Sequence, residues 1–193
     1  RLAVETSKAE LAELMVGRTV TRPVREPSTP DEIVLEAAAV TVRVGGVDRL
    51  KAIDFRLRAG EVLGIIGVSG NGQANLAQLL SGTLAKTSGD LLLFGEAVGA
   101  LSVADAVALG IGRIPEDRNK DGVIGDMSIW ENVVLERLAD FSKNGLVQRA
   151  AGVALAQRII DQFDVRGGSP ASRIRLLSGG NMQKLILGRN LIN

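Results

Sequence analysis

The sequence predicts an α/β fold, and three observations support this class. Hydrophobic residues make up 46% of the 193 residues but aromatic residues only 3%, so the core must consist mainly of Val, Leu, Ile and Ala. A core of this kind suits helices packed on a buried parallel sheet. Residues 61–84 run from a short apolar strand through a glycine-rich loop into an amphipathic helix. The length is that of one globular domain, preceded by a tail.

The N-terminal residues predict a short helix followed by a linker. Leu11, Leu14 and Met15 would share one face of a helix over residues 6–15. Residues 17–31 contain three prolines and several arginines, a composition that resists packing. We therefore expect residues 1–31 to form a helix and linker, and residues 32–193 to form the main domain.

The main domain begins with a predicted hairpin and continues with alternating strands and helices. Residues 33–44 and 50–57 are β-branched or alternating runs, separated by Gly45 and Gly46, which is typical of a hairpin. Ser128 with Glu131 three residues later predicts a capping box at the start of a helix. We expect further strands over 61–66, 90–94 and 110–114, and helices over 73–84, 103–109, 129–138, 152–163 and from Ser178 onward.

Composition excludes several kinds of site and partner. The chain has no cysteine and no histidine, which removes disulfides, thiolate nucleophiles, Ser-His triads and zinc sites that need imidazole or sulfur. The net charge of +1 gives no field that would attract nucleic acid or anionic lipid. No segment approaches the roughly 20 apolar residues of a membrane span. We expect no metal held by the protein's side chains alone and no nucleic-acid partner.

The glycine-rich loop has the spacing of a Walker A phosphate-binding loop. In such loops, successive N–H groups and a helix N-terminus converge on phosphate oxygens. The lysine and the hydroxyl that normally end the motif are replaced by Gln73 and Ala74, so the groups that neutralise phosphate and hold magnesium are missing. We expect weak or magnesium-poor nucleotide binding here and no efficient hydrolysis; an ordinary glycine turn is the alternative. The loop residues are Gly67, Val68, Ser69, Gly70, Asn71, Gly72, Gln73 and Ala74.

A second glycine motif precedes the last predicted helix. A hydroxyl and two glycines at the start of a helix leave N–H groups exposed, and the helix dipole favours an anion there. An ordinary helix cap is the alternative for so short a motif. The motif comprises Leu177, Ser178, Gly179, Gly180, Asn181, Met182, Gln183 and Lys184.

Taken together with the segment Pro115-Glu116-Asp117-Arg118, these motifs and their order resemble an ATP-binding-cassette (ABC) transporter ATPase. Gly70-Asn71-Gly72-Gln73 and the asparagine after the two glycines are similar to the C-terminal cassette of tandem-cassette ATPases that serve sugar and purine-nucleoside importers. The resemblance implies a P-loop NTPase-like cassette with an N-terminal antiparallel β part, a mainly parallel core sheet and a helical subdomain. Residues 10–18 are similar to the join between the two cassettes.

The resemblance also implies the roles of these motifs. Two cassettes of such proteins meet head to tail, so Ser178, Gly179 and Gly180 would contact ATP that is held, with Mg²⁺, by the first cassette of the same polypeptide. Leu177, Asn181 and Gln183 complete this signature motif. Glu116 lies where a glutamine that reaches magnesium and senses the membrane partner is expected; a solvated acid paired with Arg118 is the alternative.

The implied partners are the first cassette, transmembrane permease subunits and, indirectly, an extracytoplasmic solute-binding protein, with the ATPase peripheral on the cytoplasmic face of the plasma membrane. The Walker B aspartate, catalytic glutamate and switch histidine would follow beyond Asn193. We therefore expect a cassette truncated after the signature helix, inactive and poorly stable alone. The alternatives are a nucleotide-binding or interaction module, or a non-transport ABC protein.

Overall fold

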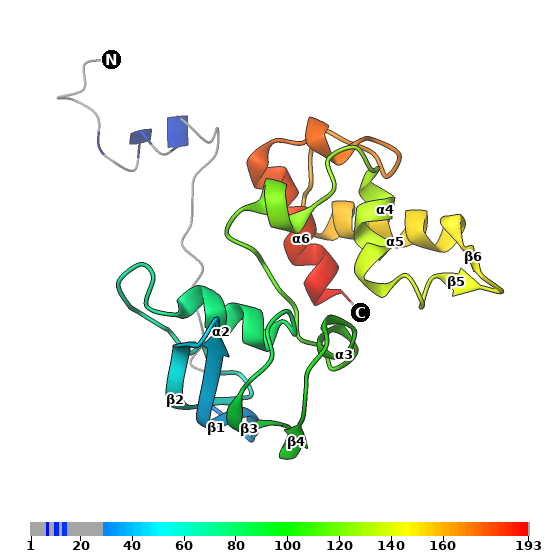
Figure 1. Ribbon diagram of the computed structural model, residues 1–193. Coiled ribbons are helices and arrows are strands. Elements are labelled where there is room, and N and C mark those ends of the chain that lie inside the picture. The colour runs from blue at the N-terminus through cyan, green and yellow to red at the C-terminus, as the bar shows by residue number, and fades with distance from the viewer. Residues whose placement is uncertain (1–6, 8–9, 12, 15–28, 193) are drawn as a thin grey trace.

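The computed structural model describes residues 7, 10–11, 13–14 and 29–192. The helix expected over 6–15 and the linker expected over 17–31 lie mostly outside these residues. The remainder forms a sheet covered by one helix and a separate group of helices (Figure 1).

The sheet has four strands in the order β2-β1-β3-β4, all paired antiparallel. Gly45 and Gly46, with φ of 59° and 80°, join the first two strands, a geometry in which glycine is favoured. The predicted hairpin and the strand expected over 90–94 are confirmed, whereas β4 was not expected. The strands are β1 (Ile33–Val44), β2 (Val47–Arg58), β3 (Ser88–Leu93) and β4 (Glu96–Val98).

Helix α2 (Gln73–Leu80) covers one face of this sheet (Figure 1). It buries Leu76 and Leu79 in a core shared with Val40, Val42 and Leu91. The helix expected over 73–84 is therefore confirmed in position but ends earlier.

The expected parallel core sheet is wrong for the described part of the chain, where every strand pair is antiparallel. Residues 61–66 and 110–114, expected as strands, are not strands. A strand exists only when a neighbour accepts its hydrogen bonds, and no described strand lies beside either segment. As a result, apolar side chains of the first segment face solvent, with Val62 75% and Ile66 99% exposed.

Most of the remaining helices pack around a second core formed by side chains such as Ile129, Ile159 and Leu185. The helices expected here are confirmed with shifted ends, while the single π-helical turn η2 and the β5–β6 hairpin were not expected. The elements are α3 (Val103–Ala108), η2 (Arg118–Gly122), α4 (Ile129–Val134), η3 (Leu135–Arg137), β5 (Ser142–Lys143), β6 (Leu146–Val147), α5 (Arg149–Gln162), η4 (Ile174–Leu176) and α6 (Gly179–Leu191).

Helix α4 begins with the predicted capping box. Ser128 N–H donates to a carboxylate oxygen of Glu131 over 2.7 Å, and Glu131 N–H donates to the Ser128 hydroxyl. The Ser128 hydroxyl, followed by the Ser128 N–H, lowers the pKa of Glu131 below its ordinary value.

Candidate functional site

The glycine loop 67–72 leads directly into α2. Gly70 and Gly72 have φ of 91° and 96°, values that favour glycine. Gly72 also lies against β2, because a Cβ there would be 2.8 Å from the Arg49 carbonyl oxygen. The loop is therefore fixed to the sheet at its last glycine.

The side chain of Gln73 folds back across this loop. Its amide Nε2 donates to the Val68 carbonyl over 3.3 Å and packs directly against Gly67. Ala74 is exposed and carries no hydroxyl. Since the loop offers neither a cation nor a metal-binding hydroxyl, its residues do not fit a magnesium nucleotide as this family of loops binds it.

A cleft of about 340 Å³ lies beside the loop, between β2 and residues 63–67. Its lining is largely apolar and includes the carboxylate of Asp54 but no cation. A negative group opposes an anionic ligand, so this cleft does not supply the charge that Gln73 lacks.

The serine–glycine–glycine turn, residues 178–180, is built differently. Leu177, only 6% exposed, anchors it in the helical core, while Ser178 and Gly180 are exposed. Ser178 caps α6, a helix of 13 residues. The sequence-predicted helix N-terminus, with its free N–H groups, is therefore present and accessible.

Asn181 fixes the hydroxyl of Ser178. Its side-chain Nδ2 donates to Ser178 Oγ over 3.0 Å, and its backbone N–H donates to the same oxygen over 3.5 Å. The Arg166 N–H donates to Asn181 Oδ1 over 3.0 Å, which settles which end of the amide is the acceptor. Since the Ser178 oxygen receives two hydrogen bonds, its own proton is left to donate outward.

An ion pair supports the same helical turn. Lys184 Nζ donates to the carbonyl of Asp164 over 2.6 Å and lies 3.3 Å from its carboxylate. The hydrogen bond from Arg166, followed by that from Lys184, holds the pKa of Asp164 below its ordinary value. Gln183 is exposed. The end of α5 is thereby tied to the beginning of α6.

The segment 115–118 leads into η2. Glu116 is exposed at a bend, and Asp117 caps the turn by accepting from the N–H groups of Asn119 and Lys120 over 3.0 and 3.1 Å. Among the described contacts, Arg118 makes no ion pair with Glu116, so the expected pairing is wrong, although Glu116 is exposed as a solvated acid would be. The guanidinium of Arg118 packs on Gly179 instead.

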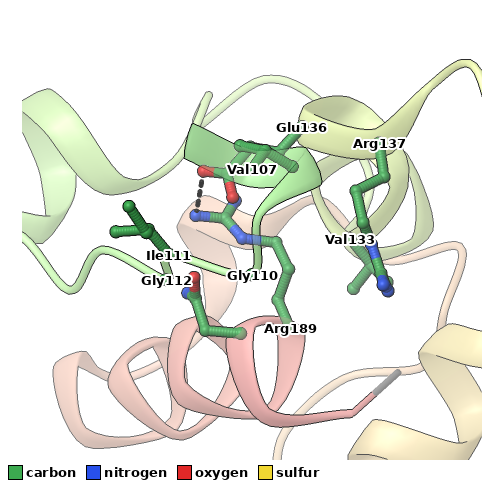
Figure 2. Close-up of a pocket in the computed structure, with 9 residues that line it drawn as sticks. Val107, Gly110, Ile111, Gly112, Val133, Glu136, Arg137 and Arg189 are labelled. Atoms are coloured by element: carbon green, nitrogen blue, oxygen red, sulfur yellow. Dashed lines mark ion pairs between the residues drawn. The ribbon is translucent and has the colours of Figure 1, made fainter. Parts of the chain in front are cut away.

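A buried polar network, which the sequence analysis did not predict, joins the last turn of α6 to η2 and α4. Arg189 is 8% exposed and pairs with Glu136 over 2.7 Å (Figure 2). It also donates to the carbonyls of Asn132 and Gly122 over 3.1 and 3.2 Å. Burial lowers the pKa of Arg189, and Glu136 opposes this shift. The sequence did contain a signal for this network, because Arg189 and Asn132 lie on helix faces that are otherwise apolar.

The chain does not bring its two glycine motifs together. The loop 67–72 leads into α2 on the sheet, whereas α6 belongs to the helical group (Figure 1). One ligand bound to this chain alone therefore cannot use both motifs. Within residues 29–192 and the few described before them, no group of three or more acidic, His or Cys side chains could hold a metal ion. Nor does any helix of the described residues have the length and apolar character to cross a membrane.

Known proteins are similar to this sequence over nearly its whole length. Residues 50–193 match the protein family described as "ABC transporter". The guanosine import ATP-binding protein NupO of Bacillus subtilis is 35% identical over 97% of the chain and 38% of its own length. The glucose import ATP-binding protein TsgD13 of Haloferax volcanii is 37% identical over 97% of the chain and 35% of its own length. The chain thus spans little more than a third of the curated relatives it matches.

Solved structures share the fold. An ATP-binding cassette of an ABC transporter in its ADP conformation, MJ1267, aligns with a TM-score of 0.63 and 18% identity, over 83% of this chain and 65% of its own. The ATP-binding cassette MJ0796, dimeric and bound to ADP and phosphate, aligns with a TM-score of 0.63 and 19% identity, over 82% of this chain and 69% of its own. At this identity the likeness concerns the fold alone.

Proposed function

Because the chain belongs to the ABC transporter family of ATP-binding proteins, we propose that it is the second cassette of an importer ATPase and completes the ATP site of a first cassette. The observation that carries this proposal is the contrast between the two motifs. Ser178 and Gly180 present a hydroxyl donor and open N–H groups, whereas Gln73 closes the glycine loop.

The chemistry of the exposed turn suits a phosphoryl group presented by another cassette. Oriented N–H dipoles and a hydroxyl donor stabilise negative charge that develops on phosphate oxygens. ATP would supply that phosphate and Mg²⁺ would come with it on the first cassette. This chain's residues would bind and orient the phosphate without holding the metal.

The loop 67–74 would form the other composite site in a degenerate form. Gln73 donates only a neutral hydrogen bond, and a charge-assisted bond is roughly twice as strong. The closed loop also supports the second reading, in which the chain contributes binding surface and no hydrolysis of its own. We expect residues 1–193 alone not to turn over ATP.

The partner in the membrane would be a permease, and this chain would bind it at the cytoplasmic face of the plasma membrane. A cleft of about 440 Å³ between α3, η2 and η3 offers the place for it, lined by Val103, Ile111, Asp121, Leu135 and others. The relatives' names include guanosine, glucose and ribose import, so we propose a sugar or a nucleoside as the solute. An extracytoplasmic solute-binding protein would act through the permease.

A matched pair of substitutions in the complete protein tests the assignment of the two motifs. Ser178→Asp keeps a helix cap, because Asp caps helices as well as Ser does, but places a carboxylate where phosphate would approach. We expect about a hundredfold loss of kcat for ATP hydrolysis, the size typical of losing a transition-state donor.

Ser69→Asp is the control, since it puts the same carboxylate in the exposed glycine loop. We expect its ATPase rate within about threefold of the parent, because a site that does not perform hydrolysis contributes little to kcat. Equal losses from both substitutions would show that the loop is also a catalytic site. No loss from either would reject the proposed function.

A further inference from the structure

The two glycines at the start of α6 have different surroundings. A Cβ on Gly179 would lie 2.9 Å from Cζ and 3.1 Å from Nε of Arg118, and closer still to Nη2. A Cβ on Gly180 would have no atom of the described residues within 4 Å. Neither residue has a positive φ, so each backbone conformation tolerates alanine. The guanidinium of Arg118 therefore lies directly against Gly179, whereas Gly180 is open.

Arg118 carries its charge into an unfavourable place. A helix N-terminus is positive, so a cation there is repelled unless an anion lies nearby. Its Nε is out of contact with solvent and has no hydrogen-bond partner among the residues that the structure describes. The carboxylate on the preceding residue, Asp117, is engaged in capping η2. Within the described part of the chain, no carboxylate forms an ion pair with Arg118, in contrast to Arg189, which pairs with Glu136.

The backbone that carries Arg118 is fixed to α6 at a second point. Arg189 Nη2 donates to the carbonyl of Gly122, the last residue of η2. A Cβ on Gly122 would lie 2.8 Å from Cδ1 of Ile186, so this end of η2 also lies close against α6. Arg118 therefore approaches Gly179 from a turn held along the helix and not from a free loop.

We propose that Arg118 is a positioning residue for the 178–180 turn: its guanidinium fills the space left by the absent side chain of Gly179, fixes that turn, and holds a positive charge beside the N–H groups that would bind phosphate. The proposal rests on the proposed function for its effect on ATP hydrolysis. The packing of Arg118 on Gly179 rests on geometry alone.

The kinetic test uses the complete two-cassette protein. Arg118→Ala should lower kcat for ATP hydrolysis about tenfold. Such a loss is a small part of the transition-state barrier, as expected for a residue that acts through the turn. KM for ATP should change by less than about twofold, because in the proposed function the first cassette holds ATP and Arg118 acts only on the turn that meets its phosphate. Arg118→Lys keeps the charge but loses the flat guanidinium. Its kcat should therefore lie between those of the parent and Arg118→Ala.

A double substitution tests whether Arg118 acts through Gly179. Gly179→Ala should lower kcat in the presence of Arg118, and adding Arg118→Ala should bring the rate back to that of Arg118→Ala alone. Gly180→Ala is the matched control, because the same added methyl group meets no atom; Arg118→Ala should not restore any rate that this substitution loses.

Thermal unfolding of the same proteins separates the contact from the chemistry. Gly179→Ala should lower the unfolding midpoint, adding Arg118→Ala should restore it, and Gly180→Ala should not lower it. An Arg118→Ala protein that hydrolyses ATP at the parent rate would overturn the positioning role while leaving the proposed function intact. A shift in the midpoint from Arg118→Ala that is the same with glycine and with alanine at position 179 would overturn the contact. A parent protein without ATPase activity would overturn the proposed function and the kinetic role together, and the unfolding data would still judge the contact.

Discussion

The glycine loop at residues 67–74 and the turn at residues 177–183 share one design, in which glycines lead into the N-terminus of a helix. They differ in what fills the space at that N-terminus. In the loop, the amide of Gln73 folds back onto Gly67 and Val68. In the turn, Asn181 holds the Ser178 hydroxyl from the side, so the space beyond the hydroxyl stays open.

They differ equally in what supports them. The turn is anchored by Leu177 in the helical core. Within the described residues, the segment before the loop has no strand partner, and Val68 is 75% exposed. If the turn binds phosphate as proposed, the comparison suggests why the loop would not: oriented dipoles stabilise charge only if the chain around them is packed and holds them in place.

The largest expected effect tests whether the turn is packed more firmly than the residues before the loop. Leu177→Ala should reduce the free energy of unfolding by about 3 kcal/mol, because it leaves a cavity in the helical core. Val68→Ala should change it by less than about 0.5 kcal/mol, since the side chain is already in water. Urea denaturation of both variants measures the two values. Equal losses would mean that residues 62–68 are packed in solution and that the contrast in support is wrong.

The next effect tests the contrast in chemistry. Gln73→Lys with Ala74→Ser restores the cation and the hydroxyl that the loop lacks, so magnesium-ATP should bind about tenfold more tightly, a gain of ~1.4 kcal/mol. Isothermal titration with and without magnesium measures the affinity. Gln73→Lys alone is the control, and its affinity should depend less on magnesium.

The opposite result would break the contrast. If the parent chain already binds magnesium-ATP as tightly as the doubly substituted chain, then Gln73 moves aside at little cost and the loop is a working nucleotide site. The closed loop would in that case be one of two accessible conformations and not a disabled site.

The sequence predicted the parts of the fold that depend on local signals. The glycine turn at 45–46, the Ser128–Glu131 capping box and the start of α6 were all found from residue type and spacing. Residues 61–66 have a strand-like pattern, but a strand also requires a neighbour that the pattern cannot supply. At residues 61–66, local preference therefore favours a strand that tertiary pairing does not form.

The features of the candidate site also fall into those that local sequence predicts and those that depend on tertiary contacts. The identity of Gln73 and Ala74 was enough to predict a loop without a cation or a metal-binding hydroxyl. The contacts of Arg118 with Gly179 and of Arg189 with Gly122 join residues far apart in the sequence, and neither composition nor periodicity reports such contacts.

The smallest expected effect compares two helix starts. Glu131 completes the capping box of α4 in the helical group, whereas Gly72, the N-cap of α2, provides no side-chain cap and α2 has no acid in its first turn. Because the pKa of Glu131 lies below its ordinary value of 4.5, its contribution to stability is present above that value and is lost as the pH falls through the lowered pKa. Glu131→Gln can still accept the Ser128 N–H hydrogen bond but carries no charge. Its free energy of unfolding should therefore be lower than that of the parent by about 0.5 kcal/mol near neutral pH, and the difference should disappear in acid.

Glu96→Gln, which removes an exposed carboxylate that caps no helix, is the control. If the difference between Glu131→Gln and the parent stays constant with pH, the charge of Glu131 does not stabilise α4.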